Sequence, residues 1–186
     1  DEGLEQARHN VEVLNSLDAE EIVTTCPGCF RALKRDYESH GLKLDLPVKH
    51  LSEFLEERLN DLNVGRFDGN VTYHDPCHLG RHMGVYDAPR NVIRRVTGKE
   101  LVEMERHAEN AMCCGNGAGL RLLWPDKAKV IADNRILQAK DIEASAIVTS
   151  CPFCKNLLAK QSGGEIKVMD LPELVLVALE DENGHK

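Results

Sequence analysis

Cysteine is the residue type in this sequence whose number and spacing could do chemistry. Two Cys-x-x-Cys pairs lie far apart, and between them stand one lone cysteine and one adjacent pair. The seven positions are Cys26, Cys29, Cys77, Cys113, Cys114, Cys151 and Cys154. An odd number of cysteines cannot be paired completely in internal disulfides. Because no secretory signal peptide opens the chain, we expect a reducing, cytoplasmic compartment, where cysteines more often bind metals or carry out redox chemistry.

The composition limits the classes of function that these cysteines can serve. The chain has 186 residues, and its 23 Lys and Arg against 31 Asp and Glu give a net charge of −8. This acidic balance argues against a nucleic-acid partner, because such proteins normally carry a basic stripe. No apolar run approaches the roughly 18 residues of a membrane-spanning helix. The chain starts with Asp1 in a helical pattern, so we expect a fragment of a longer protein.

One segment of the chain is repeated 125 residues later. The run IVTTCPGC, which begins at Ile22, returns as IVTSCPFC, which begins at Ile147. Apolar positions before and after the run also correspond, with a small gap on the downstream side. A repeat with this long period indicates two copies of one supersecondary unit, because a solenoid needs at least three copies.

Short β-branched runs alternate with helical patterns along the chain. We expect strands at residues 22–25, near Val48, and at residues 71–74, 101–104, 146–150 and 166–169. We expect helices at residues 4–17, 27–40, 51–62, 87–96 and 125–142, after Cys151 and from Leu171. This alternation predicts an α/β fold with a parallel sheet of right-handed βαβ units, in two pseudo-repeats of which the first is incomplete.

Each cysteine or cysteine pair follows one of the expected strands. Cys77 follows residues 71–74, the Cys113–Cys114 pair lies in the loop after residues 101–104, and Cys151 and Cys154 follow residues 146–150. Ligands of parallel α/β sheets bind beyond the carboxyl ends of the strands. Five thiols should therefore converge at one sheet edge, which suggests a metal cofactor.

Three segments carry a resemblance to a known family. They are YHDPCHLGR from Tyr73, ENAMCCG from Glu109 and SCPFC from Ser150. Together they closely resemble the cysteine-rich CCG domain of heterodisulfide reductases and related iron–sulfur oxidoreductase subunits. The resemblance implies that residues 1–62 are the C-terminal part of a first CCG module, residues 63–70 a linker, and residues 71–186 a complete second module.

The resemblance also implies a cofactor and its ligands. The cofactor would be an iron–sulfur cluster of the 4Fe–4S type, in heterodisulfide reductases a non-cubane one. Its ligands would be Cys77, Cys113, Cys114, Cys151 and Cys154. Because the cluster would carry out the reaction, these five residues would also form the catalytic centre. Gly115 and Gly117 would let backbone N–H groups approach the cluster. Cys26 and Cys29 would be half of an incomplete first site, although a thioredoxin-like dithiol is the alternative for this pair.

The implied function is that of an iron–sulfur subunit in a heterodisulfide-reductase-like oxidoreductase, with electron transfer and disulfide reduction at the cluster. One alternative is an electron-transfer subunit of a glycolate, lactate or glycerol 3-phosphate dehydrogenase complex. Another is a zinc-stabilised structural module, because zinc accepts four cysteines and can replace iron in a preparation. Expected partners are other iron–sulfur or flavin subunits, a membrane-anchor subunit at the cytoplasmic face, and a disulfide or other small-molecule substrate.

Histidines and aromatic residues beside the motifs are weaker candidates. His74, His78 and His82 are spaced by four, but Pro76 interrupts any helix that would place the first two on one face. Of the three we favour only His78, which would either donate a hydrogen bond or a proton at the cluster or simply pack. We expect the aromatic side chains of Phe30, Trp124 and Phe153 in the core.

Overall fold

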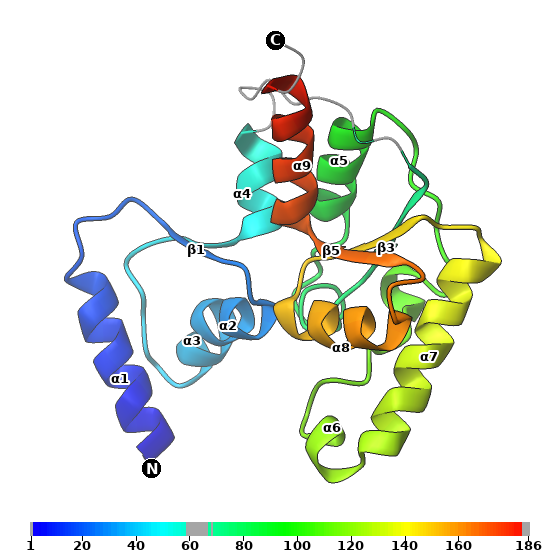
Figure 1. Ribbon diagram of the computed structural model, residues 1–186. Helices are drawn as coiled ribbons and strands as arrows, with labels where there is room; N and C mark the ends of the chain where they lie inside the picture. Colours follow the sequence, from blue (N-terminus) through cyan, green and yellow to red (C-terminus); the bar gives the residue numbers. More distant parts are fainter. Residues whose placement is uncertain (1, 59–66, 68, 184–186) are drawn as a thin grey trace.

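The computed structural model describes residues 2–58, 67 and 69–183, and these form an α/β fold with two small parallel sheets (Figure 1). The first sheet pairs β1 (Ile22–Thr24) with β2 (Val48–His50). The second has the order β3-β4-β5, and its strands are β3 (Val71–His74), β4 (Ala146–Thr149) and β5 (Lys167–Asp170). The parallel α/β class predicted from the alternation of strands and helices is thereby confirmed.

The helices lie close to the expected ranges, except for the short α6, which the sequence patterns did not indicate. They are α1 (Glu2–Asn15), α2 (Pro27–Arg31), α3 (Tyr37–Ser39), α4 (Leu51–Arg58), α5 (Asp87–Thr97), α6 (Leu120–Leu123), α7 (Pro125–Asp141), α8 (Pro152–Ser162) and α9 (Leu171–Asn183). A π-helical turn, Ala32–Asp36, joins α2 to α3, and a 3-10 turn occupies Ala108–Asn110. Prolines at the first helical positions of α2, α7 and α8 explain where these helices begin.

The internal repeat is visible in the pairing of the strands. Ile22 pairs with Val48 in the first sheet, and its counterpart Ile147 pairs with Val168 in the second. The helices that follow β2 and β5 also begin alike. In both, the glutamate three residues after the last strand residue accepts a hydrogen bond from the backbone N–H of that strand residue. The two units differ in their setting: β4 has a strand on each side, whereas β1 pairs with β2 alone within the described residues.

Helices cover both faces of the second sheet (Figure 1). Val148 of β4 packs against the apolar faces of α5 and α9. Its neighbour Ile147 points the other way and packs against α7 and α8. Both side chains are fully buried, and burial of one such side chain stabilises the fold by about 1.5–3 kcal/mol. This two-sided burial holds β3 and β4 in place, and their carboxyl ends carry the candidate site.

Three expectations from the sequence are wrong or fall outside the described residues. Residues 101–104 form no strand: one backbone bond, from Val102 N–H to the Val71 carbonyl oxygen at 3.3 Å, links them to β3. The aromatic side chains of Trp124 and Phe153 are 51% and 61% exposed, so of the three only Phe30 is a core residue. Residues 59–66 and 68, which include most of the expected linker at 63–70, lie outside the described residues.

No helix of the described chain is long and apolar enough to cross a membrane.

Candidate metal centre

Five cysteines meet beyond the carboxyl ends of β3 and β4. All five line one cleft, and each thiol shifts the pKa of the next in a series that runs from Cys77 through Cys113, Cys114 and Cys154 to Cys151. Three of the five, Cys114, Cys151 and Cys154, are buried, and all seven cysteines of the chain are free thiols. The structure therefore brings together the five residues that the sequence singled out, although the Cys113–Cys114 pair follows a 3-10 turn and no strand.

Cys151 and Cys154 lie at the start of α8. Cys151 is the N-cap residue, and Pro152 occupies the first helical position. The Cys154 thiol lowers the pKa of Cys151 to about 7, against the effect of burial, and the backbone N–H groups of Cys154 and Phe153 add to the lowering. The N-terminal end of the helix dipole also favours a negative sulfur. Cys151 is therefore prepared to act as a thiolate ligand.

The Cys113–Cys114 loop aims two backbone donors at its own sulfurs. Gly115 N–H donates to Cys113 Sγ at 3.3 Å, and Asn116 N–H donates to Cys114 Sγ at 3.4 Å. Gly115 has a φ of +87°, and a Cβ there would lie 2.5 Å from the Ala128 carbonyl oxygen, so only glycine fits. Gly117, the second predicted glycine, lines the cleft with open space around it and makes no comparable contact.

The thiols shift the pKa values of one another in opposite directions. Hydrogen bonds from the thiols of Cys114 and Cys77, with the Gly115 N–H, lower the pKa of Cys113. The thiols that donate respond in the opposite direction: the pKa of Cys77 is raised chiefly by its bond to Cys113, and that of Cys154 chiefly by its bond to Cys114. Without a metal, the five thiols therefore share fewer than five negative charges. A bound cation would release the remaining protons.

A buried ion pair fixes the turn that presents Cys77. Asp75 forms a bidentate pair with Arg90 at 2.7 and 2.9 Å, and its Oδ2 also accepts the Ala108 N–H at 2.9 Å. Arg90 in turn binds Glu103 at 2.7 Å. Asp75 thus ties the segment before Cys77 to the segment that leads to the adjacent cysteines.

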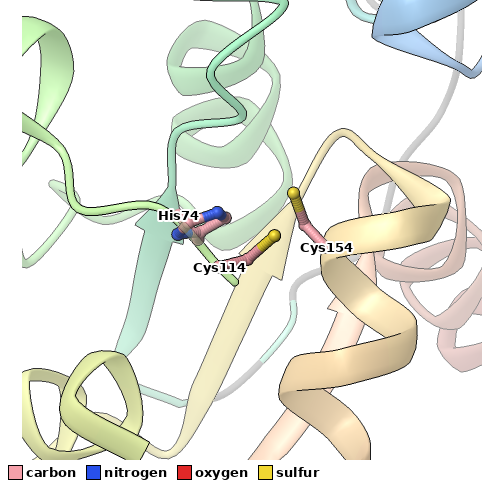
Figure 2. Close-up of side chains that lie close together, drawn as sticks. All are labelled: His74, Cys114 and Cys154. Carbon is pink, nitrogen blue, oxygen red and sulfur yellow. The ribbon is translucent and has the colours of Figure 1, made fainter. Parts of the chain in front are cut away.

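His74 is a site residue that the spacing argument missed. Its side chain is buried, and one ring nitrogen forms with the sulfurs of Cys114 and Cys154 a group whose ligand atoms all lie within 4.8 Å of one another (Figure 2). Arg135 Nε donates to His74 Nδ1 at 3.0 Å. Burial lowers the pKa of His74 to about 3, and the Arg135 charge adds to this effect, so the ring is neutral. Its place at the end of β3, three residues before Cys77, is the signal that could have found it.

The predicted histidine, His78, lies at the mouth of the site. It is half-buried, and its ring lies 4.7 Å from the ring of His82 between centroids. A Cβ at Gly28 of the first unit would lie 3.5 Å from His78 Nδ1. His78 therefore faces the Cys26–Cys29 turn across the opening.

A cleft of about 820 Å³ opens over the cysteines. Its lining residues from the first unit are Cys26, Pro27 and Gly28, and those from the second are Pro76, Cys77, His78, Cys113, Cys114, Asn116, Gly117, Ala118, Gly119, Arg121, Leu122, Cys151, Pro152, Phe153, Cys154 and Asn156. Cys26 shares this cleft with the five thiols, whereas Cys29 is exposed and makes its thiol contact with Cys26. The cleft is large enough for a small molecule to reach the sulfurs.

Buried Arg135 shows what charge the site suits. It has no exposed surface, and its hydrogen-bond partners are all neutral: His74 Nδ1, the carbonyl oxygens of Arg106 and Tyr73, and Gln138 Oε1. The carboxylates of Asp75 and Glu103 act on it without contact. Burial lowers its pKa to about 10, so it stays charged at neutral pH. A buried cation is costly unless an anion lies near it. A cluster held by several thiolates is anionic, so the donor set and its surroundings fit such a group.

The sequence profile of the cysteine-rich CCG domain family matches residues 1–34 and 71–159 of this chain. The chain belongs to this family. The second matched range of the CCG domain holds the five clustered cysteines, and the first holds the Cys26–Cys29 turn.

Curated CCG relatives are redox proteins by name. One subunit of the dihydromethanophenazine:CoB–CoM heterodisulfide reductase of Methanosarcina acetivorans is 41% identical over 182 residues, which cover 94% of this chain and 44% of that protein. The probable iron–sulfur-binding oxidoreductase FadF of Bacillus subtilis is 33% identical over 179 residues, covering 92% of this chain and 25% of FadF. The chain thus spans less than half the length of either relative.

A solved structure shares the fold alone. The aspartate racemase of Picrophilus torridus superposes with a TM-score of 0.50 at 13% identity, covering 99% of this chain and 71% of the racemase.

Proposed function

We propose that this chain is an iron–sulfur subunit of a heterodisulfide-reductase-like oxidoreductase. In this proposal Cys77, Cys113, Cys114, Cys151 and Cys154 hold a cluster of the 4Fe–4S type in a non-cubane arrangement. The observation that carries the proposal is the convergence of these five cysteines in one cleft at the carboxyl ends of β3 and β4. Membership in the CCG family and the names of both relatives support it.

The number of thiols favours iron and sulfide over zinc. Structural zinc takes four ligands in a tetrahedron, so a fifth thiol would be left over. Two adjacent cysteines, Cys113 and Cys114, cannot easily both ligate one tetrahedral ion, but they can reach neighbouring irons of a larger cluster. Buried Arg135 would compensate the charge of that cluster. Zinc stays the alternative occupant of an iron-free preparation.

The cleft gives the site a way to meet a substrate. Reduction of a disulfide takes two electrons and two protons and gives two thiols. A bound cluster would supply the electrons one at a time, having received them from an iron–sulfur or flavin subunit. In this chain, Phe153 and Arg121 line the space where a small disulfide would lie, and half-buried His78 lies at the mouth where a proton could be delivered.

The proposed organisation has an incomplete site beside the complete one. Residues 1–62 would be the C-terminal part of a first CCG module, residues 63–70 a linker, and residues 71–186 a complete second module. Cys26 and Cys29 would then be two ligands of a first cluster whose other ligands belong to another part of the protein. Support comes from the equal strand registers of the two units and from the first stretch that the family profile matches.

A second function differs in the role of the substrate. As an electron-transfer subunit of a glycolate, lactate or glycerol 3-phosphate dehydrogenase complex, the chain would pass electrons on without binding substrate. The name of FadF, which mentions no disulfide, is compatible with this role. A membrane-anchor subunit at the cytoplasmic face would be the partner in that case. The two functions separate on whether the reduced chain transfers electrons to a small disulfide.

The test is anaerobic reconstitution of the chain with iron and sulfide, followed by iron and zinc analysis and EPR. We expect about four irons per chain and a redox-active signal. Cys114→Ser should lose both, whereas Cys29→Ser, the same change at an exposed cysteine of the first unit, should keep them. One tightly bound zinc with no stable iron would overturn the proposal of an iron–sulfur cofactor. An unchanged cluster in Cys114→Ser would overturn the proposed set of five ligands.

A further inference from the structure

The tautomer of His74 follows from its contact with Arg135. The guanidinium Nε carries a hydrogen and has no lone pair to offer, so in the 3.0 Å contact Arg135 donates and His74 Nδ1 accepts. A neutral imidazole has one ring proton, which must then sit on Nε2. Nδ1 is already engaged and Nε2 carries hydrogen, so neither nitrogen offers a free lone pair to a metal. His74 can therefore donate to the site but does not ligate in it.

His50 shows the same arrangement in the first unit with a different acceptor. It ends β2 as His74 ends β3, and the Ser52 N–H donates to its Nδ1 at 3.1 Å. Its Nε2 then donates to the Thr25 carbonyl oxygen at 3.3 Å. For Nε2 of His74 the described residues provide no oxygen or nitrogen acceptor. The groups that lie beside the ring are the sulfurs of Cys114 and Cys154 (Figure 2).

Arg135, which contacts the His74 ring, differs from the other buried arginine in its partners. The other buried arginine among the described residues, Arg90, is neutralised by Asp75 and Glu103. Arg135 contacts no carboxylate among the described residues, and it is held by four neutral acceptors. The first of these contacts places its charge against Nδ1 of the imidazole. The arrangement gives the sulfurs a polarised N–H donor backed by a fixed positive charge.

We propose that Arg135 is a positioning residue that locks His74 as the Nε2–H tautomer, and that His74 donates a hydrogen bond to sulfur at Cys114 and Cys154 when the cluster is bound. This inference rests on the proposed function. Hydrogen bonds to sulfur and nearby positive charge both stabilise the more negative, reduced form of a cluster. The pair should therefore raise the reduction potential of the site.

The first test is pulsed EPR of the reduced, reconstituted chain in H₂O and in D₂O. Besides the signals of the Gly115 and Asn116 backbone N–H groups, which every variant keeps, we expect the weak coupling of an imidazole nitrogen and one further exchangeable proton. Both should be lost in His74→Leu and kept in His50→Leu, the matched buried histidine. A strong coupling of the kind given by a ligating nitrogen overturns the inference. So does a spectrum that His74→Leu leaves unchanged.

The second test is the reduction potential, followed by EPR in a redox titration. Losing the donor in His74→Leu or the charge in Arg135→Gln should shift the equilibrium toward the oxidised form about tenfold, which is about 59 mV for one electron. Arg135→Lys, which keeps the charge, should recover part of the shift. Equal potentials in all variants overturn the inference. If Arg135→Gln does not fold, the comparison of His74→Leu with His50→Leu still decides.

The same samples separate the two proposals. A wild-type chain that takes up no iron overturns the proposed function, and the inference falls with it. A wild-type chain with the expected iron but without the histidine coupling overturns the inference alone.

Discussion

The two Cys-x-x-Cys turns begin in the same way and end in different environments. Cys26 and Cys151 are both extended N-cap residues, and each is followed by a proline that starts a helix. Yet Cys151 and Cys154 are buried among other thiols, whereas Cys29 is exposed and has only Cys26 as a thiol partner. An eight-residue run therefore determines the turn, but neighbours from elsewhere in the chain determine whether the turn is part of a five-thiol site.

The neighbouring helices show the same difference on a larger scale. The repeat places α1 in the position that α7 has in the second unit, since Ala7 and Val11 correspond to Ala132 and Ile136. α7 buries five residues and covers the second sheet, whereas α1 buries none and is linked to the segment at residues 37–45 by hydrogen bonds of Asn10 and Asn15. Burial of α7 also carries Arg135 to His74. The first unit has a core around Phe30 and Val48, but its first helix is not packed as α7 is.

The largest expected effect tests the ion pair that anchors the second unit. Asp75→Asn removes one charge of a nearly fully buried pair and leaves Arg90 undercompensated, which should lower the free energy of unfolding by about 3–5 kcal/mol. Asp36→Asn in the first unit breaks a partly exposed pair with Arg31 and should cost at most about 1 kcal/mol. Urea denaturation of both variants measures the two values. Equal losses would show that the two units are anchored alike.

A smaller effect concerns pH. Burial lowers the pKa of His50 to about 4, whereas in the unfolded chain a histidine binds a proton near pH 6.5. The unfolded state therefore takes up a proton first as the pH falls, and stability is lost between pH 6.5 and pH 4. By pH 5 the loss should be about 2 kcal/mol.

His50→Gln removes the titrating group and gives the measurement for this prediction. The difference in unfolding free energy between wild type and His50→Gln should be constant above pH 7 and shrink as the pH is lowered toward 4. Denaturation at several pH values measures it on the metal-free chain. Parallel pH profiles for the two proteins would contradict the burial of a neutral His50. For His74→Gln, too, the difference in unfolding free energy from wild type should shrink as the pH is lowered.

Local patterns in the sequence were enough for most of the fold. β-branched runs gave β1, β3 and β4, and prolines marked the starts of three helices. They also placed Cys77 and Cys151 after buried strands that pair with each other. Since parallel strands end at the same edge, convergence of the cysteines could be inferred without any knowledge of packing.

The features that the sequence did not reveal depend on long-range contacts. Residues 101–104 have an apolar pattern and Met104 is indeed buried, but the segment is held by the Glu103–Arg90 pair and one bond to β3 rather than by a ladder. His74 ends the strand expected at residues 71–74, so its spacing of four from His78 carries no information about a shared helix face. Its role emerges only with Arg135, which is 61 residues away in the chain.

The smallest effect compares the third residue of each Cys-x-x-Cys turn. Gly28 in α2 has room for a methyl group, whose nearest neighbours would be His78 Nδ1 at 3.5 Å and Cys26 Sγ at 3.7 Å. Gly28→Ala should therefore stabilise the chain by about 0.5 kcal/mol, because alanine loses less backbone entropy than glycine on entering a helix. Phe153→Ala, the equivalent change in α8, removes a largely exposed ring and should alter stability by less than about 0.5 kcal/mol. Thermal denaturation of the metal-free chain measures whether each variant is more or less stable than wild type. A clear loss of stability in Gly28→Ala would mean that His78 and the Cys26–Cys29 turn cannot move apart. The first unit would then be held rigidly against the mouth of the cleft, although Cys29 of this turn is exposed.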